Sequence, residues 1–140
     1  MQASDHHTVL VVEDEAPLRA LVSDILREEG YRVEEARDGV QALDALAAPR
    51  QDAVCAVVLD MMLPRLDGVS VLRQLRRRRP GVPVVAMSAS REHLAAAVTE
   101  GARGAVPKPF DIDQLVDAVN RSCAPRCEAH GRGTSAPPRR

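Results

Sequence analysis

Residues 53–68 read AVCAVVLDMMLPRLDG, an apolar run that ends at an acid, Asp60. A run that is apolar on successive residues is typical of a strand covered on both faces, as in a parallel sheet. Residues 8–12 and 82–87 have the same character, and shorter strands fit at residues 31–36 and 104–106. We therefore expect five short strands, of which the central ones are fully buried.

Between these strands, apolar residues recur at the spacing of amphipathic helices. The five stripes are Leu18, Leu21, Val22, Ile25 and Leu26; Val40, Leu43 and Leu46; Leu72 and Leu75; Leu94, Ala97 and Val98; and Ile112, Leu115, Val116 and Val119. Asp38 and Asp67 are placed to cap the second and third helices, and Gly30, Pro80 and Gly101 to end the first, third and fourth. The pattern predicts an α/β fold of five strand–helix units, (βα)5, with a doubly wound parallel sheet.

Length and charge limit the classes of function. The chain has 140 residues, the size of one domain, and its 19 basic and 20 acidic residues leave a formal charge of −1. This balance argues against a nucleic-acid or membrane-surface partner, and Tyr31 and Phe110, the two aromatic residues, cannot form a base-stacking platform. The sequence shows neither a membrane span nor a signal peptide, so we expect a cytoplasmic protein.

The cysteines and the last residues predict little chemistry. An odd count of three, with Cys55 inside an apolar run, favours buried or incidental thiols over a disulfide framework. Cys123, Cys127 and His130 would supply only three ligands to a metal. We expect a flexible N-terminus at residues 1–7, a folded domain at residues 8–122, and a disordered basic tail rich in proline, arginine and glycine at residues 123–140.

The residues at the strand ends carry the chemistry, because ligands of open α/β sheets bind beyond the carboxyl ends of the strands. Glu13 and Asp14 follow the first strand, Asp60 the third and Ser88 the fourth, and the fifth leads to Lys108. Oxygen ligands without nearby histidine or cysteine suit Mg²⁺. An ammonium and a hydroxyl facing such a metal suit a phosphoryl group, with a carboxylate as its acceptor.

At these residues the sequence resembles the receiver domain of bacterial two-component response regulators. VLVVEDE (residues 9–15), VVLDMMLPRLDG (57–68), MSA (87–89) and PKPF (107–110) match the four signature blocks of that family in order and spacing. The resemblance covers residues 8–122 and implies a flavodoxin-like strand order of 2-1-3-4-5. It also implies a stand-alone receiver that a histidine kinase or a phosphotransfer protein phosphorylates, and that then regulates an unidentified downstream protein or passes the phosphoryl group on.

The resemblance also implies a role for each site residue. Asp60 would accept the phosphoryl group, Lys108 would pair with it, and Ser88 would bond to it and transmit the change. The Mg²⁺ ligands would be Asp14, Asp60 and the backbone carbonyl of Met62, with Glu13 reaching the ion through water. The peptide bond between Lys108 and Pro109 would be cis.

Two residues depart from the family pattern. Ala105 stands three residues before the lysine, where the family usually has a rotating tyrosine or phenylalanine, and this keeps open a pseudo-receiver that only binds partners. Met62 offers no polar group to orient a hydrolytic water, which predicts a long-lived phosphoryl group. An Mg²⁺-dependent phosphohydrolase needs an acid two residues after its nucleophile, and Met62 occupies that position, so this enzymatic alternative is the weaker one.

We expect a monomer or a weak homodimer. The run of arginines at residues 76–79 is interpreted as a solvated helix end rather than a nucleic-acid site.

Overall fold

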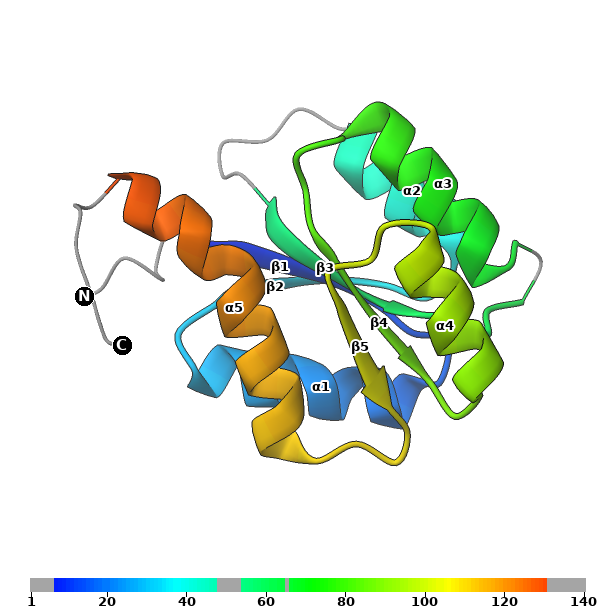
Figure 1. Cartoon of the computed structure of the whole chain (residues 1–140). Coiled ribbons are helices and arrows are strands. Elements are labelled where there is room, and N and C mark those ends of the chain that lie inside the picture. Colours follow the sequence, from blue (N-terminus) through cyan, green and yellow to red (C-terminus); the bar gives the residue numbers. More distant parts are fainter. Residues whose placement is uncertain (1–6, 48–53, 65, 131–140) are drawn as a thin grey trace.

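The computed structural model describes residues 7–47, 54–64 and 66–130, and shows one parallel sheet flanked by helices on both faces (Figure 1). The elements in chain order are β1 (Thr8–Val12), α1 (Ala16–Glu28), β2 (Arg32–Ala36), α2 (Gly39–Ala47), β3 (Val54–Asp60), α3 (Gly68–Arg78), β4 (Val84–Ser88), α4 (Arg91–Thr99), β5 (Gly104–Pro107) and α5 (Ile112–His130). The strand order is β2-β1-β3-β4-β5, with every pairing parallel. The predicted fold class and strand order are therefore confirmed.

The core consists of two apolar layers, one on each face of the sheet. Alternate residues of each strand point to opposite faces, so Val9 and Val11 join one layer while Leu10 and Val12 join the other. The first layer packs against α1 and α5, and the second against α2, α3 and α4, as the two groups of helices in Figure 1 show. Because β1, β3 and β4 are buried along their whole length, their carboxyl ends are held in fixed register.

The predicted helix boundaries rest on capping side chains and on two glycines. Asp38 Oδ1 accepts a hydrogen bond from the Gln41 amide at 2.8 Å, and Asp67 Oδ1 accepts one from the Ser70 amide at 2.8 Å. Gly30 and Gly101 follow α1 and α4 with φ values of 100° and 106°, a region that favours glycine. These four residues confirm the starts of α2 and α3 and the ends of α1 and α4.

The arginine run at the end of α3 is exposed, as predicted, and it also joins α3 to its neighbours. Arg76 Nη1 donates to the carbonyl oxygen of Glu100 just after α4, at 2.6 Å. Arg79 Nη2 donates at 2.6 Å to the carbonyl oxygen of Leu46 near the end of α2. Carbonyls at helix ends have no partner within the helix, so these two arginines act as caps supplied from a neighbouring helix.

Four apolar residues of the predicted stripes are exposed rather than buried. Leu21, Val40, Val98 and Ile112 are about half exposed, between 48% and 55%. Each lies at the margin of its stripe, where the helix surface turns away from the sheet. The stripes are therefore narrower than the sequence pattern predicts.

The expectation of unpaired thiols is wrong for two of the three cysteines. Cys55, near the start of β3, forms a disulfide with Cys123 in α5, with the two Cα atoms 5.3 Å apart. The cysteines are 68 residues apart in the sequence, and only the packing of α5 over β3 brings them together. Which cysteines pair cannot be deduced from their spacing alone.

Helix α5 is longer than expected. It ends at His130, so residues 123–130, predicted as the start of an irregular tail, lie in the helix. A proline inside a helix removes one backbone hydrogen bond and its ring crowds the carbonyl four residues earlier, which is unfavourable, yet the helix continues through Pro125 to His130. Of the N-terminal residues 1–7 that were predicted to be flexible, the structure describes His7, whose carbonyl accepts a hydrogen bond from the Arg32 amide at 3.0 Å. The other six, and the tail residues 131–140, lie outside the described residues.

A side-chain hydrogen bond also connects α5 to the segment before β2. The hydroxyl of Tyr31, the residue just before β2, donates a hydrogen bond to Asn120 Oδ1 on α5, and the Tyr31 ring is part of the core layer that α5 covers.

Among the described residues, no helix is both long and apolar enough to cross a bilayer.

Candidate functional site

The carboxyl ends of four strands bring the predicted site residues to one edge of the sheet. Glu13 and Asp14 directly follow β1, Asp60 is the last residue of β3, Ser88 is the last residue of β4, and Lys108 follows β5. The pairing of Asp60 with Met87, and of Ser88 with Pro107, aligns the ends of β3, β4 and β5. Residues that are distant in the sequence therefore meet at the edge where open α/β sheets bind ligands.

Three carboxylates form the acidic part of this edge. Glu13, Asp14 and Asp60 each offer an oxygen, and these oxygens lie within 4.8 Å of one another. Glu13 is fully buried and Asp60 is 3% exposed, whereas Asp14 is exposed to solvent. Like charges at this spacing repel, and a divalent cation would offset that repulsion. The all-oxygen donor set, open on the side of Asp14, fits Mg²⁺.

Lys108 supplies the positive charge next to this cluster. Its Nζ lies 3.0 Å from Glu13 Oε1 and 3.3 Å from Asp60 Oδ2. Burial alone would lower the pKa of Lys108, but the hydrogen bond to Glu13 and the charges of Asp60 and Glu13 outweigh it and raise the pKa. Lys108 is therefore a permanent cation that bridges two of the three acids.

Glu13 has the most perturbed carboxyl group of the site. Burial is the largest cause, and together with the charge of Asp60 it raises the pKa of Glu13 from 4.5 to about 7. The amide of Glu15, which donates to Glu13 Oε2 at 3.1 Å, and Lys108 act in the opposite direction. Glu13 thus gains or loses a proton near neutral pH, and a nearby divalent cation would favour the charged form.

The loop after β3 fixes the orientation of Asp60. The Met62 amide donates to Asp60 Oδ1 at 3.0 Å, and the Met61 amide donates to the Met87 carbonyl at 2.9 Å. The Gly68 amide, at the start of α3, donates to the Met61 carbonyl at 3.2 Å. A Cβ atom at Gly68 would lie 2.5 Å from Met61 Cα, so only glycine permits this approach. The sequence pattern did not predict a role for Gly68. Its position directly after Asp67, the N-cap of α3, could have indicated a close approach of the backbone there.

Ser88 connects the site to α4 and to the Lys108 loop. Its hydroxyl oxygen accepts a hydrogen bond from the Ser90 amide at 3.0 Å, and the Ser90 hydroxyl in turn caps α4 by accepting from the His93 amide at 3.2 Å. The Ser88 carbonyl accepts from the Lys108 amide at 2.9 Å, and the peptide bond between Lys108 and Pro109 is cis. The predicted cis bond is confirmed, and Ser88 is bonded both to the loop that follows its own strand and to the loop after β5.

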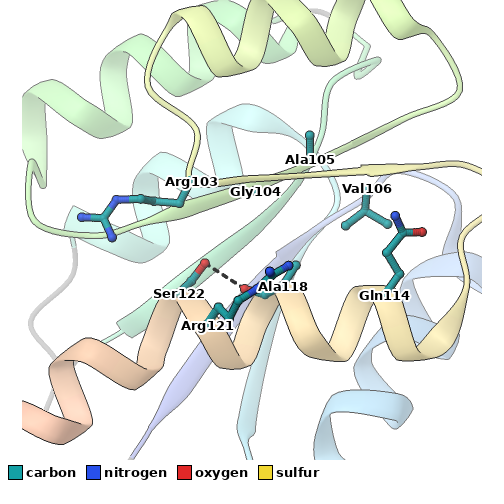
Figure 2. A pocket seen from close by; sticks show the side chains of 8 residues that line it. All are labelled: Arg103, Gly104, Ala105, Val106, Gln114, Ala118, Arg121 and Ser122. Atoms are coloured by element: carbon teal, nitrogen blue, oxygen red, sulfur yellow. Dashed lines mark hydrogen bonds between the residues drawn. The ribbon is translucent and has the colours of Figure 1, made fainter. Parts of the chain in front are cut away.

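Ala105 lies in β5, opposite Ala86 of β4, where the family pattern would place an aromatic side chain. It lines a groove of about 410 Å³ between β5 and α5, together with Arg103, Gly104, Val106, Gln114, Ala118, Arg121 and Ser122. Figure 2 shows that Ala105 and Val106 point to opposite faces of β5. Because its side chain is a single methyl group, Ala105 has no rotamers and cannot act as a rotating switch.

The geometry described above defines a (βα)5 module whose acidic edge faces a partly buried lysine, Lys108. The family model for the response regulator receiver domain matches residues 9–120 of this chain. The chain belongs to the response regulator receiver domain family.

The chain is similar to curated response regulators of Mycobacterium and Mycolicibacterium species. It is 42% identical over 110 residues to "Response regulator MprA" of Mycobacterium avium (strain 104), an alignment that covers 77% of this chain and 47% of the relative. It is 38% identical over 130 residues to the protein of the same name from Mycolicibacterium vanbaalenii, covering 91% of this chain and 55% of the relative. The chain thus spans about half the length of the curated relatives it matches.

Solved receiver domains share its fold. The receiver domain of NtrX from Brucella abortus is 36% identical with a TM-score of 0.74, and the alignment covers 83% of this chain and 98% of that one. The receiver domain of the Francisella response regulator 1452 is 30% identical with a TM-score of 0.76, covering 85% and 98%.

Proposed function

We propose that this chain accepts a phosphoryl group on Asp60, with Mg²⁺ bound at the acidic edge, and that a histidine kinase or a histidine phosphotransfer protein is the donor. The observation that carries the proposal is the position of Lys108 Nζ, 3.3 Å from Asp60 Oδ2 and 3.0 Å from Glu13 Oε1. A partly buried cation next to an acceptor carboxylate can stabilise the negative oxygens of an incoming phosphoryl group.

Each residue at the edge has a distinct role in this proposal. An oxygen of Asp60 attacks phosphorus, the new O–P bond forms, and the P–N bond to the donor imidazole breaks. Asp14, Asp60 and the Met62 carbonyl would hold Mg²⁺, with Glu13 reaching it through water. When bound, the ion neutralises charge on the phosphoryl oxygens. The Met62 amide keeps the Asp60 carboxylate oriented.

Lys108 and Ser88 receive the transferred group in the same proposal. Lys108 would exchange part of its contact with Asp60 for the phosphoryl oxygens. The Ser88 hydroxyl would leave the Ser90 amide to bond the phosphoryl group, and this exchange would loosen the cap of α4. The site would in this way report its state to the surface around α4, and a downstream protein, or a histidine further along a relay, would receive the signal.

The test is the intact mass of the protein after incubation with acetyl phosphate and Mg²⁺. The wild type should gain one phosphoryl group, and Asp60→Asn should gain none. Asp67→Asn is the matched control, because Asp67 is a nearby acid that does not belong to the acidic cluster. Asparagine can still cap α3 through the Ser70 amide, so this variant should be modified like the wild type. Modification of Asp60→Asn to the wild-type extent would refute the assignment of Asp60.

Two other functions give different outcomes in the same experiment. A pseudo-receiver that only binds partners would remain unmodified with every donor, and the small side chain of Ala105 keeps this alternative in view. An Mg²⁺-dependent phosphohydrolase would turn over generic phosphate esters. Met62, half exposed two residues after Asp60, provides no general acid for that reaction.

We propose that the reaction takes place in the cytoplasm, where histidine kinases draw on ATP. We also propose a monomer or a weak homodimer and no nucleic-acid partner for the described domain. Sedimentation of the phosphorylated and unphosphorylated protein tests the oligomeric state, with a stable dimer in both forms as the contrary result.

A further inference from the structure

We propose that Cys55 and Cys123 form a reversible redox site that locks α5 to β3 when oxidised and releases the end of α5 when reduced. The disulfide joins the strand that carries Asp60 to the last helix of the domain. The inference rests on one part of the proposed function, the location of the protein in the cytoplasm. Disulfides are rare in that compartment, and those that form there are usually transient or redox-sensing.

The surroundings of the two cysteines favour a switch over a structural staple. Both lie in the layer that packs α5 against the sheet, with 3% and 1% of their surface exposed. In the same layer, Leu115 and Val119 of α5 are fully buried against β3, β4 and β5. Helix α5 therefore has an apolar contact with the sheet that does not need the covalent bond, and the domain can remain folded in the reduced state.

The position of Cys123 decides which part of the molecule the bond controls. Cys123 is buried and lies in the C-terminal half of α5, so the disulfide ties that half of the helix to the start of β3. Ala118, Arg121 and Ser122, within the preceding turn and a half, line the groove between β5 and α5 (Figure 2). Oxidation would hold this wall of the groove in place, and reduction would leave it attached only by side-chain packing.

The chemistry balances with a small-molecule disulfide as the oxidant. One cysteine thiolate attacks that disulfide and releases one thiol, and the other cysteine then displaces the second thiol, which forms the Cys55–Cys123 bond. Two electrons pass from the protein to the reagent, and the reverse exchange with two thiols restores both cysteines. Because both sulfur atoms are buried, exchange requires local opening of α5, and we expect it to be slower than exchange at an exposed thiol.

The first test counts free thiols by intact mass after alkylation in denaturant. Full-length protein treated with glutathione disulfide should carry one group, either an alkyl group or a glutathione, at Cys127, and protein treated with dithiothreitol should take up three alkyl groups. Cys55→Ala should carry two such groups after oxidation and two alkyl groups after reduction, whereas the control Cys127→Ser should carry none and then two. Three alkyl groups on oxidised wild type, or loss of the difference in Cys127→Ser, would overturn the assignment of the pair.

The second test asks whether the bond is reversible in the folded protein. In native buffers with graded ratios of reduced to oxidised glutathione, the disulfide should titrate from fully formed to fully reduced. Reduction should lower the melting temperature by about 10 °C, as removal of a long cross-linked loop from a domain of this size predicts. A bond that stays formed in excess reduced glutathione, or a melting temperature that does not change on reduction, would refute the switch.

The redox site and the phosphoryl site can fail independently. Asp60 lies five residues after Cys55, at the other end of β3, so Cys55→Ala should still accept one phosphoryl group from acetyl phosphate. Asp60→Asn should still form the disulfide. Loss of phosphorylation alone would refute the proposed function, and loss of the disulfide alone would refute the redox site.

Discussion

Replacement of Glu13 by glutamine should stabilise the metal-free protein at neutral and alkaline pH. Glutamine has the shape of a protonated glutamic acid, so it keeps an oxygen for the Glu15 amide or for Lys108 while removing the buried charge. The pKa of Glu13 rises from 4.5 to about 7, mainly because of burial. With each pKa unit equal to roughly 1.4 kcal/mol, ionised Glu13 costs the folded state about 3 kcal/mol.

The sign of the pH dependence follows from that shift. Between pH 4.5 and about 7 the folded protein holds a proton on Glu13 that the unfolded chain releases. The contribution of Glu13 to stability is therefore fully present below pH 4.5, and it is lost as the pH rises through about 7. Glu13→Gln lacks this loss, so its stability advantage should grow from near zero at pH 4.5 to about 3 kcal/mol at about pH 8.

Urea unfolding across this pH range, in the presence of a chelator, measures the difference. Glu15→Gln is the matched control, because Glu15 is an exposed acid two residues away, and this variant should follow the wild type. Added Mg²⁺ should raise the stability of the wild type more than that of Glu13→Gln, since a cation at the acidic edge offsets the buried charge. Parallel pH profiles for the wild type and Glu13→Gln, or a wild type that is the more stable at about pH 8, would refute this account of Glu13.

Three further substitutions, with Gly81→Ala as a control elsewhere in the chain, test the segment between β3 and α3. Gly68→Ala should cost about 2 kcal/mol by thermal or urea unfolding, because its Cβ meets the Met61 backbone at 2.5 Å. Gly81→Ala, whose Cβ meets nothing within 4 Å, should change stability by less than about 0.5 kcal/mol, and equal losses would contradict the steric argument. Asp67→Ala removes the N-cap of α3 and should cost about 1 kcal/mol, checked in the same unfolding assay, with no change as the contrary result. Met62→Asn should speed the decay of the phosphorylated protein severalfold, because its amide can orient a water, and unchanged decay in a mass time course would count against the predicted long-lived phosphoryl group.

The site could be predicted from sequence because, in a parallel sheet, the residues that follow the strands in the sequence all lie at the same edge of the sheet. Asp60 ends an apolar run, and in a parallel sheet all such ends meet at one edge, so Asp60 and Lys108 were expected together. The contact between Lys108 and Glu13 was not expected, because the sequence pattern predicts which residues lie at the strand ends but not how their side chains are oriented. At 3.0 Å it is shorter than the contact between Lys108 and Asp60, at 3.3 Å.

The features that sequence reasoning missed depend on contacts between distant segments. The Cys55–Cys123 pair requires the exact position of α5 over β3, and no local pattern encodes it. Similarly, Arg79 caps a helix 33 residues away in the sequence, which its own helix gives no reason to expect. Composition indicates that residues are polar or buried, but not which distant partner they meet.

The contact between Tyr31 and Asn120 gives the chain an optical reporter of its own. Tyr31 is the single tyrosine, and no tryptophan masks its emission. Its buried ring touches the layer beneath α5, and its hydroxyl is bonded to that helix. Ultraviolet fluorescence of the unlabelled protein should therefore follow the undocking of the last helix in real time, without any engineered dye.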